Sequence, residues 1–397
     1  MNKNAFKMNN YILYWEAIMQ RRTLFKLAGT TALGMVLAPK LMAENQVPKA
    51  TSTKVLHLNF NENALGMSEK AKQAIMNSLA IGSYYPDDQR AAVITQLAAK
   101  HNVAESFISL GNGSSENIQA AVQALIVKAQ NTKQAVQLVV PDPTFNYAEL
   151  YAKALGVPVM KVPLADDFSF DLTKLKNAAE AFDGVTIFYL CNPNNPTSMI
   201  TPAKTIFPWI KSFSQNNYFL LDEAYADFVE DPAFETGMTL VKEGLKNVLV
   251  TRTFSKFYAL AGYRVGYLLA QPEVVEEVEK FMSLDNTNLA GVVAAVASLQ
   301  DKTFAKLSFQ SNAVSRQIVQ NALIELGLKF APSNGNFIFH EIKGDVKTYQ
   351  ERMKAHSILV GREFLPIKGW NRLTLGTPDE MKVFVKVLKE FRAKGWI

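Results

Sequence analysis

Short apolar runs alternate with amphipathic segments of helical length between about residue 86 and residue 290. This alternation is typical of strand–helix–strand units and indicates a parallel sheet. The runs are apolar throughout rather than at every second position, which favours a sheet covered by helices on both faces. We therefore expect a large α/β domain over residues 86–290, with strands at 135–140, 185–190, 218–221, 248–251 and 265–270.

The pattern changes after about residue 291. A long helical stretch covers 292–327, and it is followed by a strand at 337–342 and a helix at 347–356. Short strands near Ile358 and at 372–375 precede a final helix that begins at Pro378. We expect residues 291–397 to form a smaller α+β domain, with the N-terminal segment 44–85 packed against it.

Residues 1–43 have the three parts of an export signal. Gln20–Lys26 contains the pair Arg21-Arg22, an apolar segment runs from Leu27 to Leu37, and small residues lead to Ala43. Paired arginines before a mildly apolar segment resemble a twin-arginine signal. We expect a cleaved signal peptide over 1–43, the twin-arginine machinery as a partner and a periplasmic location; a membrane-surface helix or a disordered arm on a cytoplasmic protein is the alternative.

Composition narrows the remaining possibilities. The chain is 48% hydrophobic and 20% charged, which is ordinary for a globular protein. Its net charge of +6 resides mainly in residues 1–43, so the rest of the chain presents no broad basic face for nucleic acid. The 4 histidines are scattered and the single cysteine, Cys191, has no partner, so no metal site is expected.

Polar and titratable residues follow each strand of the expected sheet. Ligands bind outside the carboxyl ends of parallel strands, so these residues should meet at one edge. They are Pro141–Phe145, Cys191–Thr197, Asp222–Tyr225 and Thr253–Lys256. A Gly-rich turn, Gly111–Glu116, precedes a further helix, and the free N–H groups of a helix N-terminus favour a phosphate.

Together these groups describe a pyridoxal phosphate (PLP) site. Lys256, with serines nearby and Arg264 eight residues on, suits a Schiff-base lysine next to a phosphate. A buried Asp222 would be costly unless it pairs with a protonated pyridine nitrogen. Each signal is weak alone, and their combination in one chain order is specific.

The sequence resembles the fold-type I PLP enzymes of the aspartate aminotransferase superfamily, most closely the histidinol-phosphate aminotransferase branch. The resemblance runs over about 55–395. The stretches that carry it are Asn61–Asn63, Tyr85–Asp87, Gly111–Glu116, Asn192–Thr197, Asp222–Tyr225, Thr253–Lys256, Leu260–Tyr267 and Arg372–Pro378. It implies a large domain with a mostly parallel seven-stranded sheet and a smaller α+β domain.

The resemblance also implies roles for individual residues. Lys256 would bind the cofactor covalently and then move the proton, Asp222 would keep the ring nitrogen protonated, and Tyr225 would contact the ring oxygen. The other cofactor-binding residues implied are Gly113, Ser114, Ser115, Phe145, Asn195, Thr253, Ser255, Arg264 and, from the neighbouring subunit of a homodimer, Tyr85. The substrate-binding residues implied are Arg372 for the α-carboxylate, Asn61 in a lid and Arg362.

One departure from the branch bears on substrate. The branch commonly has an arginine directly after the strand near Ile358, where it helps to hold the substrate phosphate. This chain has Gly361 there and Arg362 one residue later. A shift of one residue turns a strand side chain to the opposite face.

We therefore predict a PLP-dependent aminotransferase that moves an amino group from an L-amino acid to a 2-oxo acid. The donor would be histidinol-phosphate-like, aromatic or basic, and the resemblance implies 2-oxoglutarate as acceptor. A decarboxylase or racemase on the same site is the alternative, since a fold does not determine a reaction. A PLP-sensing module and a nucleotide-binding protein are two further classes. Lys256 and Asp222 argue against the first, and the absence of a P-loop ending after Gly111–Glu116 argues against the second.

Overall fold

The computed structural model describes residues 55–214 and 216–397. The predicted signal peptide, residues 1–43, lies outside these ranges. Among the described residues, no helix is both long enough and apolar enough to span a membrane.

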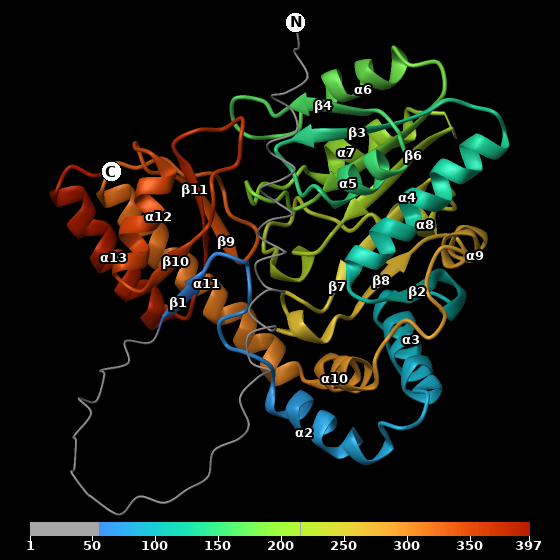
Figure 1. Ribbon diagram of the computed structural model, residues 1–397, viewed down its shortest axis with the longest axis horizontal. Helices are drawn as coiled ribbons and strands as arrows, with labels where there is room; N and C mark the ends of the chain where they lie inside the picture. The colour runs from blue at the N-terminus through green and yellow to red at the C-terminus, as the bar shows by residue number, and fades with distance from the viewer. Residues whose placement is uncertain (1–54, 215) are drawn as a thin grey trace, which may run out of the picture. The chain divides into compact units, whose positions relative to one another are not determined.

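A seven-stranded sheet forms the centre of the larger part of the fold (Figure 1). Its strand order is β2-β8-β7-β6-β5-β3-β4, and β8 alone runs against its neighbours β2 and β7. The predicted fold class, α/β with a mostly parallel seven-stranded sheet, is confirmed. The strands are β2 (Ile108–Gly111), β3 (Val136–Asp142), β4 (Val159–Pro163), β5 (Val185–Cys191), β6 (Asn217–Asp222), β7 (Val248–Thr253) and β8 (Gly266–Leu269).

Helices cover both faces of this sheet, as the uniformly apolar strands predict. Successive side chains of a strand point to opposite faces, so β5 sends Ile187 and Tyr189 into one core and Phe188 and Leu190 into the other. The first core is closed by α4 (Ser114–Asn131), α5 (Tyr147–Ala154) and α9 (Pro272–Glu279). Figure 1 shows α4 crossing in front of the strands. The second core is closed by α2 (Glu69–Ser78), α3 (Asp87–His101), α6 (Leu172–Glu180), α7 (Ala203–Lys211), α8 (Met238–Lys242) and α10 (Leu289–Gln300).

A smaller α+β part follows in the chain. Its two short sheets pair β1 (Leu56–Leu58) in parallel with β10 (Ile358–Val360), and β9 (Phe337–Glu341) antiparallel with β11 (Trp370–Thr374). The N-terminal segment divides between the two parts, because β1 pairs with β10 while α2 packs against α10. Three helices complete this part, α11 (Lys302–Glu325), α12 (Val346–Ala355) and α13 (Pro378–Ala393).

The helical stretch expected over 292–327 is confirmed and consists of more than one helix. Two helices, α10 and α11, occupy this stretch and meet at Asp301. The Asp301 backbone leaves the helical region (φ −89°, ψ 74°), and its carboxylate accepts a hydrogen bond from the Phe304 N–H at 3.1 Å. An aspartate that caps a new helix therefore interrupts a pattern that is apolar on both sides of it.

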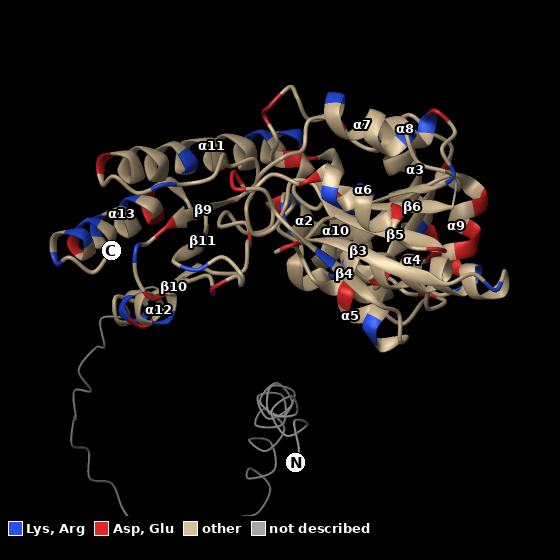
Figure 2. Ribbon diagram, turned by 90° about the horizontal axis from the view of Figure 1, so that it is seen from above, with Lys and Arg blue, Asp and Glu red and all other residues tan. Residues whose placement is uncertain are grey.

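Charged side chains are interspersed over the helices that enclose the described part of the chain (Figure 2). Basic and acidic residues both occur along α12 and α13, for example, whereas the charged residues of α9 are all glutamates. This distribution agrees with the near-neutral charge of the chain beyond residue 43.

Candidate active site

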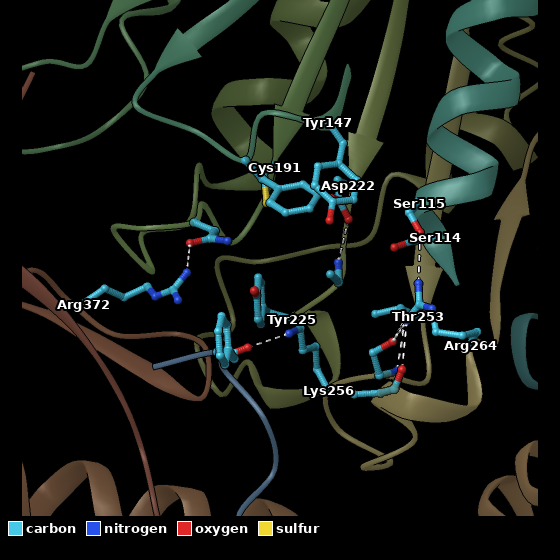
Figure 3. Close-up of a pocket in the computed structure, with 16 residues that line it drawn as sticks. Ser114, Ser115, Tyr147, Cys191, Asp222, Tyr225, Thr253, Lys256, Arg264 and Arg372 are labelled. Atoms are coloured by element: carbon cyan, nitrogen blue, oxygen red, sulfur yellow. Dashed lines mark hydrogen bonds between the residues drawn. The ribbon is translucent and has the colours of Figure 1, made fainter. Parts of the chain in front are cut away.

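A cavity of about 290 Å³ opens at the carboxyl ends of the central strands (Figure 3). Each strand end that the sequence singled out contributes to it. The arginines stand at opposite sides, Arg372 on one and Arg264 on the other, with Lys256 between them (Figure 3). The lining residues are Phe60, Ser114, Ser115, Phe145, Tyr147, Cys191, Asn195, Asp222, Ala224, Tyr225, Thr253, Ser255, Lys256, Ala261, Arg264 and Arg372.

Asp222 is the last residue of β6 and is 2% exposed. The Tyr189 hydroxyl donates to its Oδ2 at 2.6 Å, and the Ala224 N–H donates to its Oδ1 at 3.1 Å. Burial raises the pKa of this carboxyl to about 6, although both hydrogen bonds act in the opposite direction. No lysine or arginine of the described residues forms an ion pair with it, so a buried carboxylate faces the cavity without a cation.

Lys256 follows β7 and its amine lies in the middle of the cavity (Figure 3). Its Nζ donates to the Phe60 carbonyl at 3.0 Å and lies 5.9 Å from the Tyr225 ring centroid. Burial, followed by the positive charge of Arg372, lowers the pKa of this amine to about 8. A substantial fraction of Lys256 is therefore neutral near pH 8, and a neutral amine is a nucleophile.

The N-terminus of α4 and Arg264 form a cradle for an anion. Gly113 precedes α4 with φ +72°, and no side chain caps the first turn of the helix. The Arg264 Nη2 donates to the Ser115 Oγ at 3.0 Å and to the Asn112 carbonyl at 3.2 Å. A Cβ on Gly113 would collide with the Arg264 guanidinium, so this close approach requires glycine.

Two hydroxyls extend this cradle from the end of β7. The Thr253 Oγ1 donates to the Ser255 Oγ at 2.8 Å and accepts from the Ser255 N–H at 3.1 Å. The Ser255 Oγ also accepts from the Arg264 Nη1 at 3.3 Å. Backbone amides, hydroxyls and a guanidinium thus converge, as a phosphate requires.

Arg372 occupies the opposite end of the cavity, on β11. Its Nη1 donates to the Asn195 Oδ1 at 2.8 Å and its Nη2 donates to the Asn59 carbonyl at 2.5 Å. Its Nε is buried and has no hydrogen-bond partner among the described residues. Burial lowers the pKa of the guanidinium to about 10. A cation with neutral partners and an unused N–H favours a carboxylate as ligand.

Asn61 orients Tyr225 instead of lining the cavity. Its Nδ2 donates to the Tyr225 hydroxyl at 3.0 Å, and its Oδ1 accepts from the Thr374 Oγ1 at 3.1 Å. Asn61 is fully buried with φ +53°. The preceding residue, Phe60, lines the cavity and is 66% exposed.

Tyr147 and Cys191 line the cavity, although the sequence assigned a role to neither. Tyr147 stacks on Phe145, with ring centroids 4.3 Å apart, because it lies two residues further along the same turn. Cys191 ends β5 directly opposite Asp222, which ends β6. Cys191 belongs to the strand-end stretch 191–197 that the sequence singled out, although no role was assigned to it.

Tyr85 and Arg362 stand apart from this cavity. Tyr85 is 78% exposed and is not among the lining residues. The Arg362 guanidinium lies 4.3 Å from the Phe364 ring centroid, and the Arg372 guanidinium lies 5.1 Å from the same ring. Arg362 lines a neighbouring cavity of about 300 Å³. A Cβ on Gly361 would collide with the Arg372 carbonyl oxygen, so the strand pair leaves no room for an arginine at 361.

These residues fit PLP. The cradle suits the phosphate, the amine of Lys256 suits the aldehyde, and the buried Asp222 carboxylate lacks the cation that a protonated pyridine nitrogen would supply. Phe145 lines the same cavity and offers an aromatic ring on which the cofactor ring can stack.

Comparison with known proteins places the chain in a family. The model of the family "Aminotransferase class I and II" matches residues 53–388. The histidinol-phosphate aminotransferase of Moorella thermoacetica is 32% identical over 340 residues, which cover 85% of this chain and 86% of that protein.

Two solved structures are similar over nearly the same range. A candidate histidinol-phosphate aminotransferase from Erwinia carotovora atroseptica is 42% identical, with a TM-score of 0.82, covering 86% of this chain and 97% of that one. The histidinol-phosphate aminotransferase of Sinorhizobium meliloti, in complex with pyridoxal-5'-phosphate, is 25% identical, with a TM-score of 0.77, covering 86% and 91%. The chain belongs to the class I and II aminotransferase family and uses PLP as its cofactor.

Proposed function

We propose that this protein transfers the amino group of an L-amino acid to a 2-oxo acid through the cavity described above. The observation that carries the proposal is the order of groups across the cavity, from the anion cradle through the Lys256 amine to Arg372. When bound, PLP supplies an aldehyde that condenses with amines and a ring that withdraws electrons. The residues of the chain bind the cofactor and the substrate, orient them and move a proton.

Each end of the cavity has one task. Arg264, with the α4 N-terminus and Ser255, holds the phosphate. Arg372 holds the substrate carboxylate through its free Nε and an Nη that gives up a neutral partner. Arg264 and Arg372 lie on opposite sides of Lys256 (Figure 3), so a substrate bound between them would bring its α-carbon near the Lys256 amine.

Lys256 accepts the proton from the substrate α-carbon and later donates it to a different carbon atom. A general base works best with a pKa near the operating pH, and a pKa of about 8 meets this condition. Asp222 would hold the proton on the ring nitrogen of PLP, and Tyr225 and Asn195 would donate hydrogen bonds to its ring oxygen. Asn61 fixes the Tyr225 hydroxyl at 3.0 Å.

The donor that we propose is an amino acid with an imidazole or other aromatic side chain. The named relatives are histidinol-phosphate aminotransferases, and aromatic rings lie at the substrate end, with Phe60 in the lining and Phe364 against Arg372. The acceptor that we propose is 2-oxoglutarate. Histidinol phosphate itself would need Arg362 to swing from Phe364 toward its phosphate, because Gly361 carries no side chain.

A spectral titration tests this function. Purified protein with PLP should show a visible absorbance band, which the true L-amino acid donor removes and a 2-oxo acid restores. Histidinol phosphate, histidine, aromatic and basic amino acids should be compared. Carbon dioxide release without dependence on a 2-oxo acid would replace the transaminase proposal with a decarboxylase.

We also propose that the active unit is a homodimer in which Tyr85 reaches the phosphate cradle of the neighbouring subunit. Tyr84 and Tyr85 are 72% and 78% exposed, which is unusual for two adjacent aromatic residues. Light scattering measures the mass in solution. A monomer that is fully active would overturn the proposal.

Export by the twin-arginine route is a further proposal. It rests on Arg21-Arg22 and the apolar stretch that follows, and it agrees with the cofactor, since that route carries folded, loaded proteins. Cell fractionation of the full chain beside a double Lys variant, Arg21→Lys with Arg22→Lys, tests it. Equal periplasmic amounts of both chains would contradict it.

A further inference from the structure

The carboxylate of Asp222 is held at both oxygens by groups outside the cofactor. The Ala224 N–H reaches Oδ1 at 3.1 Å, and the Tyr189 hydroxyl reaches Oδ2 at the shorter distance of 2.6 Å. A short hydrogen bond from a hydroxyl to a charged oxygen is among the stronger kinds in proteins. Tyr189 does not line the cavity, so it acts on the site through Asp222 alone.

The register of the sheet explains why these side chains meet. β5 and β6 are parallel, with Cys191 opposite Asp222. Tyr189 lies two residues before Cys191, so it points to the same face as Asp222. It is therefore the diagonal neighbour of Asp222, a position that a long aromatic side chain can span.

Tyr189 is suited to be a permanent donor. It is 0% exposed, and burial together with the charge of Asp222 raises the pKa of its phenol well above the ordinary value. The phenol therefore keeps its proton at neutral pH and above. A buried hydroxyl without an acceptor would be costly, so the pair also determines how the Tyr189 ring is placed.

We propose that Tyr189 is a positioning residue that keeps Asp222 ionised and aimed at the cofactor ring nitrogen. Asp222 and the ring nitrogen share one proton, and that proton resides on the less acidic of the two groups. A hydrogen bond from Tyr189 makes the carboxylate a weaker base, so the proton stays on nitrogen. This inference rests on the proposed function of Asp222.

Other groups around Asp222 do not replace this hydrogen bond. The neighbouring charge on Glu223 is balanced by Arg252, whose Nη2 lies 2.7 Å from the Glu223 Oε2. Burial raises the pKa values of Cys191 and Tyr225, so both remain neutral. The Thr251 hydroxyl, on the register partner of Asp222 in β7, also lowers the pKa of the carboxyl, but its effect is smaller than that of Tyr189. The Lys256 amine is a further charged group that faces Asp222.

The Tyr189→Phe variant tests the inference in protein free of cofactor. The measurement is the infrared band of the protonated Asp222 carboxyl as a function of pH, assigned by its loss in Asp222→Asn. The midpoint should rise above about 6 in Tyr189→Phe, by roughly 1 to 2 pH units for the loss of a hydrogen bond to a charged group. An unchanged midpoint would overturn the inference.

Tyr349→Phe is the matched control. Tyr349 is also buried, in the core of the smaller part, and its hydroxyl has no hydrogen-bond partner among the described residues. The control should leave the Asp222 midpoint unchanged. Site-specific replacement of Tyr189 by difluorotyrosine keeps the ring and strengthens the donor, so the midpoint should fall below that of the wild type. A rise would contradict the inference.

PLP affinity supplies an independent readout through a double-mutant cycle. Tyr189→Phe should weaken PLP binding about tenfold when Asp222 is present and should leave it unchanged in the Asp222→Asn background. An equal loss in both backgrounds would show that Tyr189 acts through packing and would overturn the inference. A wild-type chain that does not bind PLP would instead overturn the proposed function, with the Asp222 titration still readable.

Discussion

The two ends of the active-site cavity are built in different ways. At the cofactor end, Asp222 and Thr253 end neighbouring strands of the seven-stranded sheet, and Ser114 begins an 18-residue helix. At the substrate end, Arg372 lies on a two-stranded sheet and Phe60 lies beyond the end of a three-residue strand. The cofactor end is therefore part of a rigid core, and the substrate end is assembled from short elements.

This difference assigns the chemistry to the cofactor end of the cavity and the choice of substrate to the other end. A polar group at a central strand end is positioned by the ladder hydrogen bonds on both sides, and it cannot move without disturbing the sheet. Arg372 is placed instead by contacts with Asn195 and the Asn59 carbonyl, which come from distant segments. We expect changes at the cofactor end to remove all activity and changes at the substrate end to alter which amino acids react.

The largest effect is expected for Lys256→Ala. Loss of the amine removes both the attachment of PLP and the proton transfer, so kcat should fall by about 10⁴-fold or more. Steady-state kinetics with the best donor measures this loss. Lys246→Ala, which breaks a surface ion pair with Glu273, is the control and should retain full activity.

Arg372→Lys should affect substrate and leave the cofactor in place. An ammonium cannot reproduce the bidentate geometry of a guanidinium on a carboxylate, so kcat/KM should fall about 100-fold. The PLP dissociation constant, measured from the visible absorbance, should not change. If PLP binding weakened as much as kcat/KM, the two ends of the cavity would not be separable.

Arg264→Lys is the corresponding substitution at the cofactor end, and it should affect PLP and leave substrate binding unchanged. The guanidinium contacts Ser115, Ser255 and the Asn112 carbonyl, which a lysine cannot do together. PLP affinity should fall by roughly 10-fold or more, since hydrogen bonds to charged groups are among the strong ones. With PLP saturating, the KM for the amino acid should remain that of the wild type.

Gly361→Ala tests why the strand pair excludes a side chain beside Arg372. The new methyl would collide with the Arg372 carbonyl oxygen, and overpacking of this kind costs about 1–3 kcal/mol. Thermal unfolding should show the loss. Gly82→Ala is a suitable control because a Cβ there meets its nearest atom at 3.4 Å, an ordinary contact. Equal stability of the two variants would rule out the proposed collision.

The smallest effect concerns acid stability of the substrate end. Burial lowers the pKa of His340, on β9, to about 4, from an ordinary value of about 6.5. As the pH falls, His340 is protonated at a higher pH in the unfolded chain than in the folded protein. The stability that neutral His340 contributes is therefore present above pH 6.5 and is lost as the pH falls toward 4. His340 alone should lower the free energy of unfolding by about 2 kcal/mol between pH 7 and pH 5.

His340→Gln should reduce this pH dependence in urea unfolding measurements. His101, whose pKa burial lowers to about 3, remains in that variant and retains its own share. An identical pH profile for His340→Gln and the wild type would show that His340 is protonated in the folded protein as readily as in the unfolded chain.

The cofactor end of the cavity could be predicted from the sequence more completely than the substrate end. The strands that carry the cofactor end were predictable, because runs such as 185–190 and 248–251 are apolar throughout and are followed by polar residues. The edge strand β4 was missed, because exposed residues such as Met160 and Lys161 interrupt its apolar pattern.

Residues that act through tertiary contacts could not be predicted locally. Tyr189 lies within an apolar strand and reads as core, and its role depends on the register between β5 and β6. Arg362 and Arg372 meet over Phe364 only after β10 and β11 are placed in space. The order of motifs along the sequence indicates the chemistry. The contacts at the substrate end join residues that are distant in the sequence, so they cannot be predicted from local pattern.

The central claim is that Lys256 is the residue to which PLP attaches. Protein loaded with PLP can be reduced with borohydride, digested and mapped by mass spectrometry. The account predicts one pyridoxyl group per chain, on the peptide that contains Lys256, and none in Lys256→Ala. A pyridoxyl group on another lysine in the wild type, together with undiminished transamination by Lys256→Ala, would contradict it.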